Sequence, residues 1–255
     1  MPSNWHRPTD KKPHVARRRF GQHFLHQRQV LEKIVDAVAP SPDDCIIEIG
    51  PGEGALTRPL LEKVAKLEVI EVDRDLASSL AAAFPPWKLT VHCADALAFD
   101  FARFPAGMRL VGNLPYNVST PLLFHLARYA GRVRDMHFML QLEVVERMVA
   151  APSTPAYGRL SVSLQSRFRI RKLFNVSRGA FRPPPKVESA LVSLVPLEEP
   201  LLLDEDLLRK AFSARRKTIK NSMPGIDFAA LGIDPKLRPE NLSPQDYSRI
   251  SRRAR

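Results

Sequence analysis

The chain has 255 residues, a hydrophobic content of 44% and a formal net charge of +12. No apolar stretch approaches the roughly 20 residues of a membrane-spanning helix, and no apolar run follows the charged start MPSNWHRPTDKKPH, so we expect no membrane anchor, no secretory signal and a cytoplasmic protein. Two cysteines, Cys45 and Cys93, are too few for a disulfide framework or a cysteine metal site. We expect two buried thiols and no metal.

From residue 45 onward, short apolar runs alternate with helical patterns, which is typical of βα units and a parallel sheet. The last two strands have no clear crossover helix, so we expect an antiparallel end to the sheet. The expected strands are 45–49, 67–72, 88–94, 109–113, 136–140, 171–177 and 189–195. The expected helices are 55–64, 73–84, one capped by Ser119 or Thr120 with Pro121 early in it, 141–150, 157–168, 204–223 and 243–253.

The segment PLEEP, at 196–200, indicates a domain boundary. We expect three parts: a basic N-terminal arm over 1–28 that carries FGQHFL, an α/β catalytic domain over 29–198, and a small basic all-helical domain over 199–255.

Glycines follow the first expected strand in EIGPGEG, where the backbone must turn tightly and approach a ligand at the carboxyl edge of the sheet. Glu71 ends the second strand, placed to accept hydrogen bonds from two ribose hydroxyls, and Asp95 follows the third, where it can accept one from an adenine amine. A dehydrogenase and an S-adenosylmethionine (SAM) methyltransferase share this geometry, so the glycine turn alone leaves both open. The acidic Glu48 and the GxGxG spacing favour SAM, because one end of SAM is an amino acid and not a pyrophosphate.

The tetrapeptide NLPY follows the fourth strand. The exocyclic amine of adenine is a poor nucleophile, because its lone pair is conjugated into the ring. The side-chain oxygen of Asn113 and the carbonyl of Leu114 can accept its two N–H bonds and favour the tetrahedral geometry that methylation needs, while Pro115 fixes the local φ. Tyr116 offers a ring face for a flipped base. An isolated motif of this kind would be a capped turn beside a core tyrosine, but its position after these strands predicts adenine methylation.

Positive charge is concentrated in three segments. Residues 1–28 carry a net charge of +6, residues 201–255 carry +5, and residues 159–186 contain eight Arg and Lys with no acid. Separated positive charge is typical of polyanion-binding proteins, because contacts of Lys and Arg with phosphates release condensed counterions. A solvated basic surface is the alternative, and we expect a nucleic acid partner.

Together, these motifs resemble those of a known family. RRRFGQHFL, EIGPGEGALT, EVDRDL, GNLPYNVSTPLLFHL, AFRPPPKVESA and RRKTIKNS are similar to motifs of the bacterial small-subunit (16S) ribosomal RNA adenine N6,N6-dimethyltransferases, the kasugamycin-resistance type. The resemblance covers nearly the whole chain from Arg17 onward. It implies a class I SAM-dependent methyltransferase fold: a Rossmann-like α/β domain with a mostly parallel seven-stranded sheet and an antiparallel end, plus a C-terminal all-helical domain that binds rRNA.

The resemblance also implies a substrate. It points to SAM-dependent dimethylation of the N6 amines of two adjacent adenosines near the 3′ end of 16S rRNA, late in small-subunit biogenesis. The implied partner is 16S rRNA within the immature small subunit, with no obligate protein partner.

The same resemblance assigns residues to roles. Phe181 is expected to close over the target adenine opposite Tyr116, with an ordinary core aromatic as the alternative. The family usually has GQNF where this chain has GQHF, so His23 replaces an amide, and we expect a modest pH dependence of SAM affinity. The SAM site is expected to contain His23, Leu25, Gly50, Glu71, Asp95 and Asn113, and the catalytic loop Asn113, Leu114, Pro115 and Tyr116. A basic helix over 215–222 is expected to bind rRNA phosphates through Arg215, Arg216, Lys217 and Lys220.

Three alternatives remain beside this enzyme. An RNA-binding assembly checkpoint, whose occupancy of the immature subunit matters more than its chemistry, is favoured equally by the basic segments. An NAD-dependent oxidoreductase rests on the glycine turn alone. The related erythromycin-resistance methylases act on large-subunit rRNA, although FRPPPKVESA and RRKTIKNS favour the small-subunit type.

Overall fold

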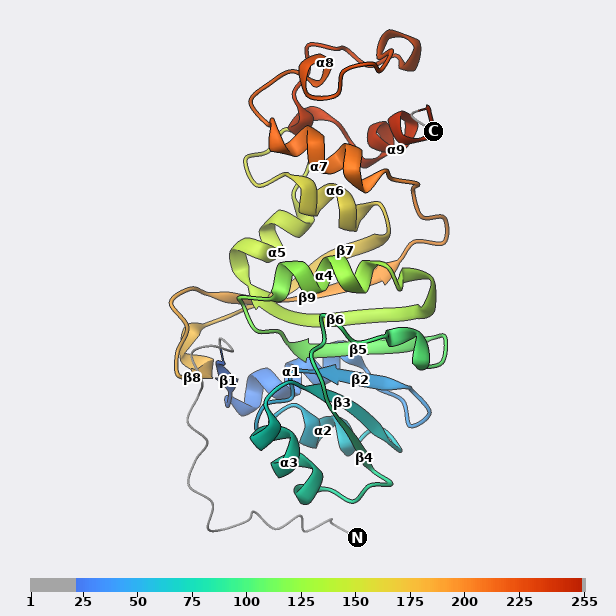
Figure 1. Ribbon diagram of the computed structural model, residues 1–255. Helices are drawn as coiled ribbons and strands as arrows, with labels where there is room; N and C mark the ends of the chain where they lie inside the picture. Colours follow the sequence, from blue (N-terminus) through green and yellow to red (C-terminus); the bar gives the residue numbers. More distant parts are fainter. Residues whose placement is uncertain (1–21, 254–255) are drawn as a thin grey trace.

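The computed structural model describes residues 22–253, so most of the expected N-terminal arm lies outside the described residues (Figure 1). A seven-stranded sheet runs in the order β4-β3-β2-β5-β6-β9-β7. The strands are β2 (Ile46–Ile49), β3 (Leu67–Glu71), β4 (Leu89–Cys93), β5 (Met108–Asn113), β6 (Val133–Gln141), β7 (Phe168–Val176) and β9 (Ser189–Pro196).

Neighbouring strands from β4 to β6 pair in parallel, and β9 is antiparallel to both β6 and β7. All four residues of β2 are buried, as expected for a strand covered on both faces. The seven expected strands and the antiparallel end are therefore confirmed, with shifts of a few residues at their ends.

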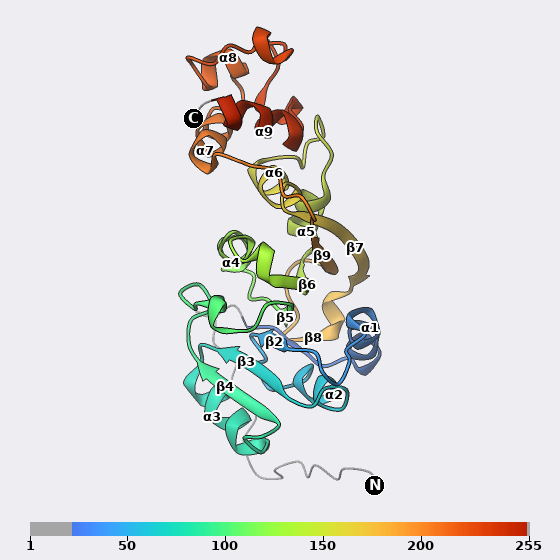
Figure 2. The same cartoon turned by 90° about the vertical axis from the view of Figure 1, so that its right-hand side faces the viewer.

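Helices cover both faces of the sheet. α4, α5 and α6 contribute Leu122, Val145 and Leu160 to one buried cluster, and α1 and α2 contribute Val35 and Leu60 to the cluster on the other face. Figure 2 shows α4 and α1 on opposite sides of the sheet. The helices are α1 (Arg28–Val38), α2 (Thr57–Leu61), α3 (Arg74–Ala83), α4 (Ser119–Ala127), α5 (Leu142–Val149), α6 (Arg159–Gln165), α7 (Glu205–Ser213), α8 (Ile219–Ser222) and α9 (Pro244–Arg253).

Several local expectations were wrong. Neither Ser119 nor Thr120 caps α4: Ser119 is its first residue, and its hydroxyl donates to the carbonyl of Tyr116 over 3.2 Å. The helix expected over 157–168 ends at Gln165, because β7 begins three residues later. Cys93 is exposed rather than buried, since it ends the edge strand β4.

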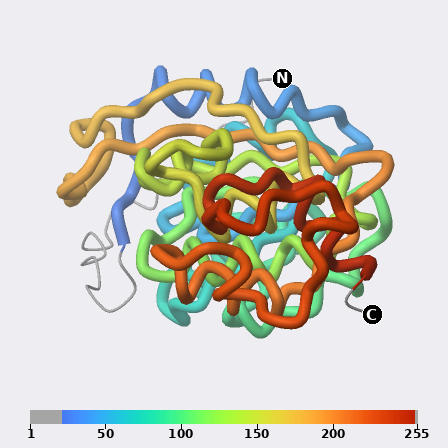
Figure 3. The backbone as a smooth tube through the Cα atoms, turned by 90° about the horizontal axis from the view of Figure 1, so that it is seen from above, coloured from blue at the N-terminus to red at the C-terminus, as the bar shows by residue number. Residues whose placement is uncertain are grey.

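The C-terminal helices share a third buried cluster with the segment between α5 and α6. Within this cluster the hydroxyl of Tyr157 donates to the carbonyl of Leu242 over 2.9 Å, and Tyr247 donates to Pro239. Seen from above, the C-terminal segment (red) lies in front of the middle of the molecule, and the blue segment that contains α1 runs along one edge (Figure 3). The three-part division of the chain stays a prediction.

A buried arginine attaches α1 to the sheet. Arg109 of β5 is 3% exposed and donates to Asp135 of β6 over 3.0 Å and to Asp44 over 2.6 Å. The same guanidinium donates to the carbonyls of Val38 and Ala39, where α1 ends. It therefore satisfies backbone groups that a helix terminus leaves open, and it pairs with two carboxylates that stabilise its buried charge.

Gly112 brings β5 close to β2. A Cβ atom there would lie 2.3 Å from the carbonyl oxygen of Ile49, which is far inside van der Waals contact. Only glycine permits this approach at the carboxyl ends of the two central strands. Within residues 22–253, no helix is long and apolar enough to cross a membrane.

We expect Gly112→Ala to lower the free energy of unfolding by about 2 kcal/mol or more, because backbone must move to admit the methyl group. Urea unfolding measures this loss. Gly131→Ala is the matched control, because a Cβ there meets nothing within 4 Å. Equal stability of the two variants would contradict the close approach.

Candidate active site

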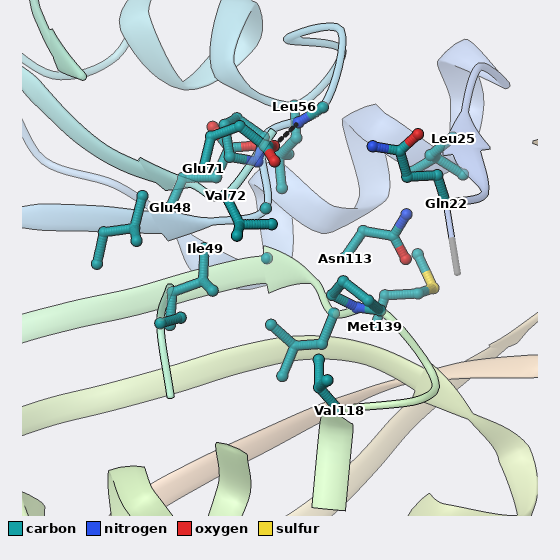
Figure 4. Close-up of a pocket in the computed structure, with 18 of the residues that line it drawn as sticks. Gln22, Leu25, Glu48, Ile49, Leu56, Glu71, Val72, Asn113, Val118 and Met139 are labelled. Carbon is teal, nitrogen blue, oxygen red and sulfur yellow. Dashed lines mark hydrogen bonds between the residues drawn. The ribbon is translucent and has the colours of Figure 1, made fainter. Parts of the chain in front are cut away.

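One pocket lies at the carboxyl edge of the sheet, between the loops that follow β2, β3, β4 and β5. Figure 4 shows Glu48, Glu71 and Val72 on one side of it and Asn113 and Met139 on the other. All six residues expected at the SAM site line this pocket, together with the rest of NLPY: His23, Leu25, Gly50, Glu71, Asp95, Asn113, Leu114, Pro115 and Tyr116. Their placement follows from topology, because the carboxyl ends of parallel strands meet at one edge.

The glycine turn joins two strand ends. Gly50 has a φ of +69°, in the left-handed region that favours glycine, and its N–H donates to the carbonyl of Ile70 over 2.9 Å. The N–H of Gly52 donates to Glu71 Oε2 over 3.1 Å. The turn after β2 is thus held against the end of β3, and its backbone lines the pocket.

Glu71 is 5% exposed, and both of its carboxylate oxygens already accept a backbone N–H. Oε1 accepts from Asp73 over 2.9 Å and Oε2 from Gly52. Burial raises the pKa of Glu71, and these two N–H donors oppose the rise. Each oxygen keeps a lone pair, so a fixed carboxylate can accept hydroxyl hydrogens of a ribose.

The neighbouring wall combines an apolar surface with an acceptor. Val72 is 42% exposed and lines the pocket with Ala96 and Leu97. Asp95 is exposed, and its Oδ1 accepts the N–H of Leu97 over 2.9 Å. A flat apolar ring bearing an amino group, such as adenine, matches this surface.

Glu48 is a buried acid in the pocket wall, 1% exposed. Thr57 Oγ1 donates to its Oε2 over 2.6 Å. Burial raises the pKa of Glu48 to about 8; the hydrogen bond from Thr57 opposes the rise, and the charge of Glu71 adds to it. The carboxyl of Glu48 is therefore mostly protonated at neutral pH.

Asn113 ends β5 with its amide held in one orientation. Its Nδ2 donates to the backbone carbonyl of His23 over 2.8 Å. The amide nitrogen is thereby engaged, and Oδ1 has no hydrogen-bond partner in the described part of the chain. Leu114 follows with its N–H donating to Met139 over 3.2 Å. The structure thus leaves the side-chain oxygen of Asn113 as the acceptor.

The side chain of His23 contacts both Pro183, in the loop after β8, and Tyr116, in the NLPY loop. Its Nδ1 lies 2.7 Å from the carbonyl oxygen of Pro183, and its ring lies 5.4 Å from that of Tyr116, at an interplanar angle of 32°. His23 therefore bridges the loop after β8 (Phe181–Arg182) and the NLPY loop. The pH dependence expected from this residue stays a prediction.

Tyr116 is positioned by a residue that the sequence did not single out. Its hydroxyl lies 2.5 Å from Oγ of Ser189, the fully buried first residue of β9. Burial raises the pKa of the Tyr116 hydroxyl, and the hydrogen bond with Ser189 opposes the rise. The only sequence signal was the place of Ser189 at the end of FRPPPKVES.

The expected position of Phe181 needs correction. Phe181 is 1% exposed and does not line the pocket. Antiparallel pairing of β1 (Phe24–Leu25) with β8 sets it opposite Leu25, and it packs in one buried cluster with Met139 and Leu191, which do line the pocket. The core-aromatic alternative describes its position: it supports the pocket wall from behind.

The four cations expected to bind rRNA lie outside this pocket, and the helix expected over 215–222 is wrong. The chain is extended at Thr218, with ψ 158°, before the short α8 begins. Arg215 is engaged by Glu240 over 3.4 Å and by the carbonyl of Pro155 over 3.1 Å. The other three are exposed and have no carboxylate partner among residues 22–253: Arg216, Lys217 and Lys220.

The pocket chemistry suits SAM. The buried acid of β3, the glycine turn and the apolar wall fit a nucleoside with an amino acid end, and across the described range no three His, Cys, Asp or Glu residues form a group that could hold a metal ion. The fold and the site define a class I SAM-dependent methyltransferase.

Comparison with known proteins gives the family. A family model described as "Ribosomal RNA adenine dimethylase" matches residues 13–255, so the chain belongs to this family. It is 54% identical over 251 residues to "Ribosomal RNA small subunit methyltransferase A" of Chromobacterium violaceum, covering 93% of this chain and 95% of that one.

Two solved structures share the architecture. One is a dimethyladenosine transferase from Plasmodium falciparum, with a TM-score of 0.76 and 28% identity, covering 89% of this chain and 96% of that one. The other is the 23S rRNA methyltransferase ErmE, with a TM-score of 0.70 and 27% identity, covering 90% and 98%. The oxidoreductase alternative is set aside by the family.

We expect Tyr116→Phe and Ser189→Ala each to lower kcat about two- to tenfold with little change in KM for RNA, because each removes the same orienting hydrogen bond, which contributes about 0.5–1.5 kcal/mol. The double variant should lose no more than either single one. Ser119→Ala is the matched control, since its hydroxyl meets only the backbone of Tyr116. Losses that multiply in the double variant would show that the two side chains act separately.

We expect Glu48→Gln to stabilise the ligand-free protein at pH 8 by roughly 1–3 kcal/mol, and much less at pH 5. The folded pKa of about 8 lies above the unfolded value near 4.3, so wild-type stability falls as pH rises between them. Urea unfolding at both pH values measures the difference. Glu53→Gln, at an exposed position of the same turn, is the control. An E48Q gain that is equal at both pH values would contradict the buried, protonated carboxyl.

Proposed function

We propose that this protein uses SAM to convert two adjacent adenosines near the 3′ end of 16S rRNA to N6,N6-dimethyladenosine, within the immature small subunit and late in its biogenesis. The observation that carries the proposal is the oriented amide of Asn113 at the rim of a SAM-type pocket, in a chain of the rRNA adenine dimethylase family. The named small-subunit relative at 54% identity supports this substrate over large-subunit rRNA.

The proposed chemistry needs positioning more than acid–base catalysis. When bound, SAM supplies a methyl group already activated by its sulfonium. Glu71 holds the ribose hydroxyls, Asp95 accepts from the adenine amine of the cofactor, and the Gly50 turn lets the backbone approach the amino acid end.

The target adenine is held by the NLPY loop. Asn113 Oδ1 and the carbonyl of Leu114 accept the two N–H bonds of its amine, which localises the nitrogen lone pair and favours tetrahedral geometry. The ring of Tyr116 stacks on the flipped base. Pro115 fixes the chain between them. Each transfer would release S-adenosylhomocysteine, and the methylated amine would lose one proton to solvent. After the first methylation one N–H remains for these acceptors, so the same groups serve the second transfer.

The exposed cations Arg216, Lys217 and Lys220, with Arg215, are proposed to contact rRNA phosphates. The reaction is placed in the cytoplasm, where small subunits assemble. The checkpoint role coexists with this chemistry, because binding and methylation rest on different residues.

We expect Asn113→Ala to reduce methyl transfer at least 100-fold while binding to unmethylated small subunits changes less than twofold. Filter binding and transfer of labelled methyl groups measure the two quantities on one preparation. Asn117→Ala is the matched control, because Asn117 is an exposed neighbour in the same loop that does not line the pocket. A parallel loss of binding and transfer in N113A would count against the chemical role of Asn113.

A further inference from the structure

The basic segment 159–186 is not accounted for by the pocket or by the C-terminal cations. Its central part, Phe168–Val176, forms β7, the last strand in the sheet order and therefore an edge strand. Arg169 and Arg171 pair with Val195 and Ser193 of β9. Side chains alternate along a strand, so both arginines project from one face, about 6.6 Å apart.

That face is open to solvent. Val195, which pairs with Arg169 and shares its face, is 40% exposed. Its neighbour in β9, Leu194, lies on the other face of the sheet and is fully buried. The helix layer of α1, α2 and α3 packs over Leu191 but does not cover Val195. Both arginines are exposed.

The charge of this face is not neutralised. Arg167 and Arg178, the neighbouring arginines, pair with Glu205 over 3.0 Å and Glu188 over 3.4 Å. In contrast, five exposed cations of the segment have no carboxylate partner within the described residues: Arg169, Arg171, Lys172, Arg182 and Lys186. Lys172 pairs with Val192 and alternates to the other face of the strand. We call the remaining four the β7 basic edge.

The β7 basic edge leads to the pocket. β7 is antiparallel to β9, which is antiparallel to β6, so β7 ends at the edge of the sheet where the pocket lies. Its last residue, Val176, pairs with Ser189, whose hydroxyl meets that of Tyr116. The other end of β7 follows α6, which packs against α7 and α9 of the C-terminal segment (Figure 1).

We propose that the β7 basic edge binds phosphates of the rRNA strand that carries the target adenine, between the pocket and the C-terminal cations. This inference rests on the proposed function and adds a second RNA contact to it. Charge complementarity favours RNA, because closely spaced, unpaired arginines suit successive phosphates. Edge-strand charges also prevent strand-to-strand association, and the test separates these roles.

The test is the double variant Arg169→Glu/Arg171→Glu. It keeps a charged edge, so protection from association persists, whereas phosphate contacts are lost. Binding to unmethylated small subunits, measured without SAM across a range of salt concentrations, should weaken at least tenfold near 0.1 M salt. The slope of log K against log salt should shrink by about 1.4–1.8, because two phosphate contacts are removed.

Lys33→Glu/Lys63→Glu is the matched control, since both lysines are exposed and have no carboxylate partner among residues 22–253, and they lie on α1 and just after α2, not on the edge strand. It should retain wild-type affinity and slope. SAM affinity and monodispersity of R169E/R171E should match the wild type.

If R169E/R171E binds small subunits with the wild-type affinity and salt slope, phosphate binding by the β7 basic edge is overturned. The proposed methyltransferase function is not affected by that result. Failure of the proposed function has a different signature: the wild-type protein would transfer no methyl groups to small subunits, whatever the slope of the variant. An equal loss in the K33E/K63E control would show a general effect of net charge and would also overturn the proposal.

Discussion

The hydrogen bond from Asn113 Nδ2 to the carbonyl of His23 is the contact on which the site depends. An asparagine amide has one donor end and one acceptor end, and a strand end does not by itself decide which faces a ligand. The carbonyl of His23 accepts from the amide nitrogen of Asn113, so the amide oxygen of Asn113 stays available as an acceptor. The same contact ties β1 to the end of β5, and Arg109 fixes the far end of α1, so the motif is anchored on both sides.

The pocket and the surfaces proposed to bind RNA differ in their charge. The pocket wall carries two buried acids: Glu71, which can accept from ribose hydroxyls, and Glu48, whose carboxyl is mostly protonated at neutral pH. Exposed cations without a carboxylate partner lie outside the pocket, on β7 and the C-terminal segment, where we propose that they contact phosphates. In the proposed complex, this charge distribution attracts RNA to the rim, and only the target base enters the pocket.

The strands and the SAM site could be predicted because their signals are local. Continuous apolar runs mark buried parallel strands, and residues that end such strands must meet at one edge, so Glu71, Asp95 and Asn113 were found together. The pair β1–β8 was missed because two-residue strands carry no periodic pattern. The break before α8 was missed because tertiary contacts override propensity: Ile219 is fully buried, and its N–H donates to Leu237 over 2.7 Å. The partnership of Ser189 with Tyr116 joins residues 73 apart, which spacing alone does not reveal.

The most direct measurement is transfer of labelled methyl groups from SAM to small subunits isolated from a strain that lacks the modification, with large subunits and naked rRNA alongside. The account predicts two methyl groups on the N6 amine of each of two adjacent adenosines near the 3′ end of 16S rRNA, and none on large subunits. Transfer to large subunits, or none to small subunits, would contradict it.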